Sequence, residues 1–331
     1  MSEVRRRLMT GDAAAYAVLP VFMAAALPFM SFPTWLTLTV AGAAMGMMLF
    51  LMASGLSLIF GLMDVINFAH GAFISLGAYL AADVLAALPG LVEDPSWSAS
   101  LLTLGAALAV AIAVTAVAGW LFELVIVRRV YGSHLRQILI TVGGLIVAQQ
   151  LLIVVWGANA VPIAKPAAFR GSIVVLGASI EVYRLVAVVL GLAVCLALEF
   201  VLARTRLGLL VRAGVENREM VEALGFRVRR LFVGVFVLGS ALAGVGGVMW
   251  GAYQGLVTPA IGPDMMILVF IILIIGGMGT VGGSFVAAIL VGLATNYAGF
   301  LAPKLALGSN ILLMVAILLW RPRGLFPAVK Q

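Results

Sequence analysis

The chain has 331 residues, of which 64% are hydrophobic and only 10% carry a charged side chain. Globular proteins usually have ~45–50% apolar and ~25% charged residues. With a mean hydropathy of +1.21, this chain has more apolar surface than a soluble fold can bury. The composition predicts a membrane protein and excludes a soluble enzyme and a disordered scaffold. The single cysteine, Cys195, excludes a disulfide framework and a thiolate metal site.

Apolar stretches that approach the ~20 residues needed to cross a bilayer recur along the whole chain. They predict an all-α polytopic membrane protein with broken or re-entrant segments, about eight to eleven crossings (ten preferred) and one transmembrane domain over 1–331. The first stretch contains Pro20 and Pro28, which favours a retained helix over a cleaved signal peptide. The last two stretches before residue 302 could also form one span and a re-entrant segment. The candidate stretches are 13–30, 34–60, 66–88, 99–127, 137–156, 182–203, 231–252, 265–281, 284–302 and 309–320.

The net charge of +7 has a simple spatial pattern. If the N-terminus is inside and the ten stretches alternate, all but four of the 20 Lys and Arg residues fall in inside segments. This distribution follows the positive-inside rule and predicts cytoplasmic N- and C-termini. The basic excess therefore reflects topology, and we expect no nucleic-acid partner. The four residues left outside are Lys165, Arg170, Arg184 and Lys304.

The longest outside segment, 157–181, has two prolines and a β-branched run at 172–175. It is expected to fold as a small hairpin or a short helix. No segment outside the apolar stretches is long enough for an ATP-binding core, and the chain has no P-loop pattern or EF-hand loop. We expect no ATP hydrolysis by this chain, no cofactor and no bound metal.

Polar residues placed in lipid mark candidate sites. Asp64, Asn67 and His70 recur at three-residue spacing, followed by Gly71. On a helix these side chains would occupy neighbouring faces of the first two turns. One interpretation is a discontinuous helix that lines or gates a transport pathway. The other is a helix start near the inner surface, with Asp64 as a cap and His70 bonded to a neighbouring helix.

A second glycine-rich stretch, GGMGTVGGS, occupies 276–284. It is typical of a tight turn between two packed helices. Two interrupted stretches, one in each half of the chain, are also what an internal repeat in a transporter would leave behind. Too few residues are identical between the halves to establish such a repeat.

The longest cytoplasmic segment is 204–230. Four of its residues fit a short amphipathic helix that ends at Gly225, namely Glu216, Met220, Ala223 and Leu224. Such a helix could dock into a groove on a partner protein. It could equally lie on anionic lipid with its arginines as anchors. The residue pattern alone does not decide between these.

Four blocks in this order resemble the permeases of branched-chain amino-acid ABC transporters. They are LIFGLMDVINFAHG at 58–71, followed by LGAY at 76–79; the cytoplasmic segment; GGMGTVGGS at 276–284; and WRPRGLF at 320–326. The resemblance covers about 42–326. ABC importers carry an E-A-A-x-x-x-G pattern in their coupling loop. Glu219 and Gly225 have the spacing of that pattern, but Met220 and Val221 replace its two alanines.

The resemblance implies a subunit of an ATP-driven importer in the bacterial inner membrane that works by alternating access. Its implied partners are a second permease, two cytoplasmic ATPases that bind the ATP, and a periplasmic binding protein. The cytoplasmic loop would then be the ATPase coupling loop, and this chain would be the first permease type of the pair. The residues that match the loop of the family are Arg212, Glu216, Glu219, Ala223 and Gly225.

The substrate stays open at this stage. Branched-chain or other small hydrophobic amino acids are expected, but related permeases carry urea, short amides or small carboxylates. A secondary transporter driven by ions, with Asp64 and His70 as a relay, is the alternative from another class. An intramembrane enzyme has little support, because His70 and His134 are the only histidines.

Overall fold

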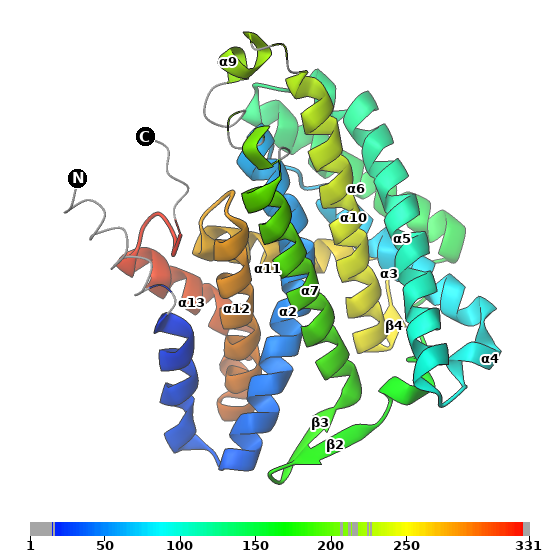
Figure 1. The fold of residues 1–331 in the computed structure, drawn as a ribbon, viewed down its shortest axis with the longest axis vertical. Helices are drawn as coiled ribbons and strands as arrows, with labels where there is room; N and C mark the ends of the chain where they lie inside the picture. The colour runs from blue at the N-terminus through cyan, green and yellow to red at the C-terminus, as the bar shows by residue number, and fades with distance from the viewer. Residues whose placement is uncertain are drawn as a thin grey trace.

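The computed structural model describes residues 15, 17–205, 208–210, 213, 218–223, 225 and 227–326. They form a bundle of long helices (Figure 1). Within the described residues, seven helical segments are long and apolar enough to span a membrane, and three shorter apolar helices accompany them. The protein is therefore a polytopic membrane protein. A helix lies at the position of each of the predicted apolar stretches.

The helices follow the predicted order along the chain. The first, Ala17–Phe29, is one of the short ones and ends in the 3₁₀ turn η1 (Leu27–Phe29). The other apolar helices are α2 (Phe32–Met63), α3 (His70–Ala87), α5 (Trp97–Val125, followed by the 3₁₀ turn η2, Val127–Arg129), α6 (His134–Trp156), α7 (Val182–Arg204), α10 (Val228–Gln254), α11 (Ile261–Gly276), α12 (Val281–Leu301) and α13 (Ala306–Trp320).

Helix α2 runs through the middle of the bundle. Ser31 caps its N-terminus by accepting a hydrogen bond from the Thr34 amide, and the central part of the helix is 89% buried. Small residues allow its neighbours to approach closely, as is usual between membrane helices. A Cβ on Gly55 would lie 3.0 Å from Gly239 Cα of α10, and one on Gly46 would lie 2.7 Å from the Ala288 carbonyl oxygen of α12. The core therefore surrounds α2.

Helices α5, α6 and α7 lie at the periphery. Between 11% and 28% of their apolar segments is buried. In α5 every fourth residue faces inward, so that the buried stripe consists mainly of small side chains. This spacing follows one face of a helix. The stripe contains Ala99, Thr103, Ala107, Ala111, Thr115, Gly119 and Glu123.

The outer segment, 157–181, contains both a short helical turn and a hairpin, which the sequence offered as alternatives. The 3₁₀ turn η3 (Ala167–Phe169) precedes an antiparallel hairpin of β2 (Ser172–Val175) and β3 (Ala178–Glu181). Both hairpin-turn residues, Leu176 and Gly177, have positive φ angles, as two-residue hairpins favour. A second pair, β1 (Val161–Pro162) with β4 (Leu256–Val257), was not predicted.

The hairpin lies at one end of the bundle, and the short helix α9 (Arg218–Ala223) lies at the other (Figure 1). We call these the outer and the inner end, following the charge pattern. Two short elements complete the fold, α4 (Pro89–Val92) and the 3₁₀ turn η4 (Pro303–Leu305).

The glycine-rich stretch at 276–284 contains the tight turn between α11 and α12. Gly277 and Gly279 adopt positive φ angles there, and Gly279 Cα would lie 2.7 Å from a Cβ on Gly61 of α2. The two helices are separate elements. With 16 residues, α11 is about 24 Å long and shorter than a hydrocarbon core of ~30 Å.

Candidate functional site

The chain is not helical between α2 and α3. Helix α2 ends at Asp64, which adopts the left-handed conformation with φ 51°, and α3 begins at His70. Asp64, Asn67 and His70 therefore do not share the first two turns of one helix, and the chain is discontinuous here, as one of the two interpretations expected. Asp64 terminates α2 because its backbone leaves the right-handed region. It does not cap α3, whose first amides donate to carbonyl groups of residues 67–69.

Helix α6 provides the side chains that hold this break. The Ile66 amide donates to Gln137 Oε1 at 3.4 Å, and the Phe68 amide donates to Thr141 Oγ1 at 3.2 Å. Gln137 and Thr141 are fully enclosed, although α6 is otherwise mostly exposed. They replace the backbone partners that a helix would have supplied, because unsatisfied amides are costly away from water. Sequence reasoning missed both. Their signal was two polar residues one turn apart in an apolar stretch.

His70 and Asn67 are completely buried. His70 Nε2 lies 2.9 Å from the Met52 carbonyl oxygen of α2. Because a carbonyl only accepts, Nε2 carries the proton and donates. His70 is thus bonded to a neighbouring helix, as one of the two interpretations required. His70 Nδ1 and both side-chain polar atoms of Asn67 have no hydrogen-bond partner in the described chain.

The Asp64 side chain is 57% exposed at the inner end. Its carboxylate lies 3.6 Å from His134 Nε2 at the start of α6. Asp64 therefore pairs with His134, while His70 pairs with Met52. The structure does not join Asp64 and His70 into the relay that the ion-coupled alternative needs.

Gly71 lies where α3 crosses α11. A Cβ at Gly71 would lie 2.8 Å from Met266 Cγ and 3.0 Å from the Gly262 carbonyl. One turn later, Ser75 Oγ accepts a hydrogen bond of 2.9 Å from the Gly262 amide. A glycine is needed at position 71 because the two backbones are nearly in contact.

The cytoplasmic loop forms the predicted short helix. Helix α9 ends before Gly225, which has φ +84° and donates its amide to the Glu222 carbonyl at 3.0 Å. Ala223 is exposed, and Val221 is buried on the opposite side. Arg212 and Glu216 lie outside the described residues, and Glu219 is described only through its place in α9.

Two shallow cavities of about 420 and 460 Å³ lie beside α9. Arg227, Val228 and Arg230 line both of them. Arg229, Glu222 and Val233 complete the first, and Leu210, Val221, Gly225 and Leu231 complete the second. The inner surface beside α9 is thus hollowed, and its lining combines apolar side chains with Arg227, Arg229 and Arg230.

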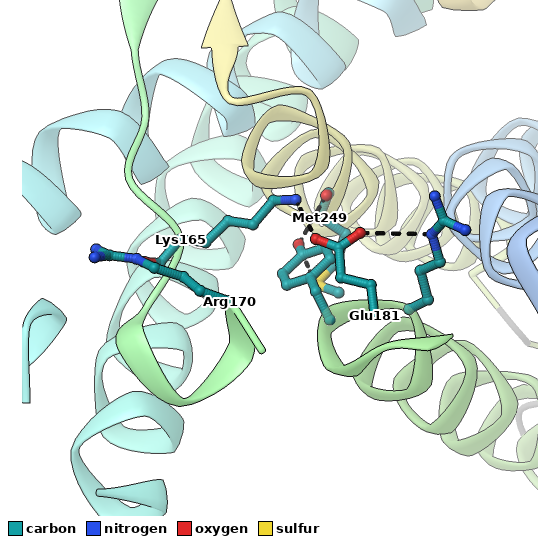
Figure 2. Close-up of polar contacts among 6 residues, drawn as sticks. Lys165, Arg170, Glu181 and Met249 are labelled. Carbon is teal, nitrogen blue, oxygen red and sulfur yellow. Dashed lines mark hydrogen bonds and ion pairs between the residues drawn. The ribbon is translucent and has the colours of Figure 1, made fainter. Parts of the chain in front are cut away.

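A polar cluster holds the outer segment to the bundle (Figure 2). Lys165 Nζ contacts Glu181 Oε1 at 2.6 Å, and Arg184 Nε lies 3.5 Å from Glu181 Oε2. Beside them, the hydroxyl of Tyr183 donates to the Met249 carbonyl of α10 at 2.8 Å. Together with the pair of Arg170 and Glu93, these contacts give acidic partners to three of the four basic residues that the charge pattern left outside.

Arg170 forms a two-pronged pair with Glu93, with N–O distances of 2.8 and 2.7 Å. The guanidinium holds the pKa of the Glu93 carboxyl below its usual value, mainly through these hydrogen bonds. The same bonds raise the pKa of Arg170. This pair ties the outer segment to the loop before α5.

The fold defines a multi-pass membrane protein. Residues 38–319 match the profile of the family described as "Branched-chain amino acid transport system / permease component". The chain belongs to this family. It is a permease component of an ABC transporter and is not itself an ATPase, as the sequence predicted.

Individual relatives agree with this assignment. The chain is 29% identical over 299 residues to the "High-affinity branched-chain amino acid transport system permease protein LivH" of Escherichia coli (strain K12), covering 88% of this chain and 95% of LivH. It is 30% identical over 305 residues to BraD of Pseudomonas aeruginosa, covering 88% and 96%. The match to E. coli LivM, at 31%, covers 39% of this chain and 30% of LivM. The protein is thus LivH-like, the first permease type. No solved structure matches the chain.

Proposed function

We propose that this chain is one of two transmembrane subunits of an ATP-driven importer for branched-chain or other small hydrophobic amino acids in the bacterial inner membrane. It crosses the membrane ten times with both termini in the cytoplasm. The observation that carries the proposal is the inner end, where α9 terminates at Gly225 beside a hollow lined by Arg227 and Arg230.

This inner surface docks an ATPase. A short helix with Ala223 exposed and Val221 buried presents one face to a partner while the other holds it to the bundle. The arginines that line the hollow suit an acidic surface on the partner. Arg212, Glu216, Glu219, Ala223 and Gly225 are the coupling residues, and ATP binds to the partner subunits alone.

The substrate passes between this chain and a second permease, outside the core that surrounds α2. The central part of α2 is 89% buried, which leaves no route along the axis of the bundle. The break at 64–71 acts as a gate, with Asp64 near the inner surface, Asn67 and His70 buried, and Gly71 at the crossing with α11. Closure of the ATPases and delivery by a periplasmic binding protein bias the same pair of states, inward-facing and outward-facing.

The relatives support this substrate class, since their names specify branched-chain amino acids. Urea, short amides and small carboxylates are the alternative, because the binding protein selects the substrate. Binding of radiolabelled leucine and urea to the binding protein of the transporter separates them.

The docking assignment is tested with Gly225→Val in the complete transporter reconstituted in liposomes. We expect uptake and the stimulation of ATP hydrolysis by the binding protein to fall at least tenfold, with a normal amount of permease in the membrane. Gly132→Val is the matched control, because Gly132 also has a positive φ angle at the inner end and open space around it. Normal uptake in Gly225→Val, or equal loss in both variants, overturns the assignment.

The same liposomes test the ion-coupled alternative. Uptake should require ATP inside the vesicles and should persist when an ionophore collapses the proton and sodium gradients. Loss of uptake with the ionophore, at unchanged ATP, contradicts the proposed energy source.

A further inference from the structure

Helix α11 lies along the break between α2 and α3. Near its N-terminus, the backbone of Gly262 packs against Gly71 at the start of α3. Further along, the ring of Phe270 lies 4.7 Å from the ring of Phe68, within the break itself. The turn that follows α11 then reaches the last turn of α2 through Gly279. Because α11 contacts the break at both ends and in between, the position of this helix and the conformation of the break depend on each other.

The chain returns to the end of α11 after α13, in a turn that we call the C-terminal strap (321–326). The amides of Leu325 and Phe326 donate to the carbonyl oxygens of Ile275 and Gly276 at 2.8 and 3.1 Å. The carbonyl groups in the last turn of a helix have no partner within the helix. The strap supplies these partners, and the side chain of Leu325 is fully buried in the contact. The strap thus fastens the end of α11 that lies beside α2.

Gly324 allows the strap to approach α11 this closely. Its φ angle is +81°, and a Cβ built on it would lie 2.8 Å from the Gly277 amide nitrogen and 2.9 Å from the Ile274 carbonyl oxygen. Both contacts are to backbone atoms, which cannot rotate away as the end of a side chain can. Even a methyl group at position 324 would therefore hold the strap away from the end of α11.

Thr280, in the turn between α11 and α12, connects the strap to α2. Its hydroxyl lies within 3.4 Å of three carbonyl oxygens, those of Gly276, Gly277 and Phe326. A hydroxyl has one proton, so it donates to one of these at a time and can exchange the strap for its own turn. The backbone carbonyl of Thr280 accepts a hydrogen bond of 3.3 Å from Ser57 of α2. The strap, the turn and α2 therefore meet at this residue.

We propose that the C-terminal strap is a conformational device that holds α11 against the break and opens when the break changes shape. Thr280 is the positioning residue that links the strap to α2. Hydrogen bonds between neutral groups join the strap to α11, so it opens at moderate cost. The inference rests on the proposed function for the role of the break as a gate. It adds a second element, more than 250 residues away in the sequence, that sets the state of this gate.

The test compares Gly324→Ala with Gly132→Ala in the complete transporter in lipid nanodiscs. Both glycines have a φ angle of +81°, but a Cβ at position 132 has open space around it. The control therefore reproduces the backbone strain without opening the strap. Hydrogen–deuterium exchange is read by mass spectrometry from peptides that cover the break (64–71) and the outer hairpin (172–181). We expect Gly324→Ala alone to exchange at least fivefold faster in the break, with the hairpin unchanged.

Unchanged exchange in the break overturns the proposal. Equal acceleration in the break and the hairpin also overturns it, because the strap then only supports the bundle as a whole. Hydrogen exchange needs neither substrate nor ATP. A failure of this test is therefore distinct from a failure of the proposed function, which the uptake experiments in liposomes detect.

Thr280→Val and Thr280→Ser provide a second readout. Valine removes the hydroxyl and nearly keeps the shape of the side chain, whereas serine keeps the hydroxyl. ATP hydrolysis by the complete transporter without binding protein should rise at least threefold in the valine variant, because the resting state of the gate is no longer held. The serine variant should hydrolyse ATP at the wild-type rate. Equal rates in the two variants contradict the role of the hydroxyl.

Discussion

The break at the inner end and the polar cluster at the outer end use different kinds of side-chain contact for the same purpose. Each holds a non-helical segment against distant helices. At the outer end, Glu181 and Glu93 pair with three basic residues at 2.6–3.5 Å. At the inner end, neutral side chains of Gln137 and Thr141 hold the backbone at 3.2–3.4 Å, and three buried polar atoms have no partner in the described chain.

The difference indicates where the molecule can change shape. Moving the outer segment would separate several satisfied charge pairs. Moving the break would exchange weak bonds between neutral groups and could give Asn67 and His70 the partners they lack in this state. A conformational change of the kind that alternating access needs therefore costs less at the inner end.

The largest loss of stability is expected when both α6 side chains that hold the break, Gln137 and Thr141, are replaced by apolar ones. The double variant Gln137→Leu/Thr141→Val leaves the amides of Ile66 and Phe68 buried without acceptors, which should cost about 3 kcal/mol of stability. The measurement is thermal unfolding of the purified permease, with uptake measured in parallel. We expect a lower unfolding temperature and little uptake.

Thr37→Val is the control for that experiment. The Thr37 hydroxyl bonds only to the Pro33 carbonyl of its own helix, so its loss should be nearly neutral. If the double variant unfolds at the same temperature as this control, the bonds from α6 do not hold the break.

A smaller effect of opposite sign is expected at Asn67. Asn67→Leu removes a buried amide without partners, so it should stabilise this state by about 1 kcal/mol. Uptake should nevertheless become slower, because one of the two states is then favoured over the other. The paired control, Asn310→Leu, removes an amide that donates to Thr295 at 2.9 Å and should lower stability. A destabilised Asn67→Leu would show that this amide has a partner.

The smallest effect is expected at the exposed pair of the outer end. In Arg170→Gln the two-pronged contact with Glu93 is lost, and surface pairs contribute little. Since the folded pKa of Glu93 lies below its ordinary value of 4.5, the stabilisation is present above pH 4.5 and disappears as the pH falls through the lower, folded value. Unfolding temperatures of wild type and variant should differ slightly at pH 7 and by less at pH 3. If the unfolding temperatures differ equally at both pH values, the loss of stability in Arg170→Gln comes from packing and not from the charge pair.

The sequence predicted most of the fold because hydropathy is a local property. The helices lie at the predicted stretches, the β-branched run at 172–175 became β2, and Gly225 ends α9 as its lack of a side chain allows. The strands β1 and β4 were missed because each has two residues and its partner lies far away in the sequence. No periodicity can reveal such a pair.

The candidate site was predicted as a region, but its geometry was not. Helical spacing suggested that Asp64 and Asn67 are helical, whereas a left-handed aspartate ends α2 first. Such a conformation is rare outside glycine and has no strong sequence signal. Gln137 and Thr141 were missed because their role depends on contacts with residues 66 and 68, more than seventy positions earlier.

The backbone bonds of Leu325 and Phe326 also bear on how the protein is made. Their amides donate to the carbonyl oxygens of Ile275 and Gly276 at 2.8 and 3.1 Å, so the last turn of α11 gains these partners only after about fifty further residues have been synthesised. Helices α11, α12 and α13 should therefore mature as one cooperative unit after residue 326 leaves the ribosome. Until then, the two carbonyl groups depend on water or on the insertion machinery.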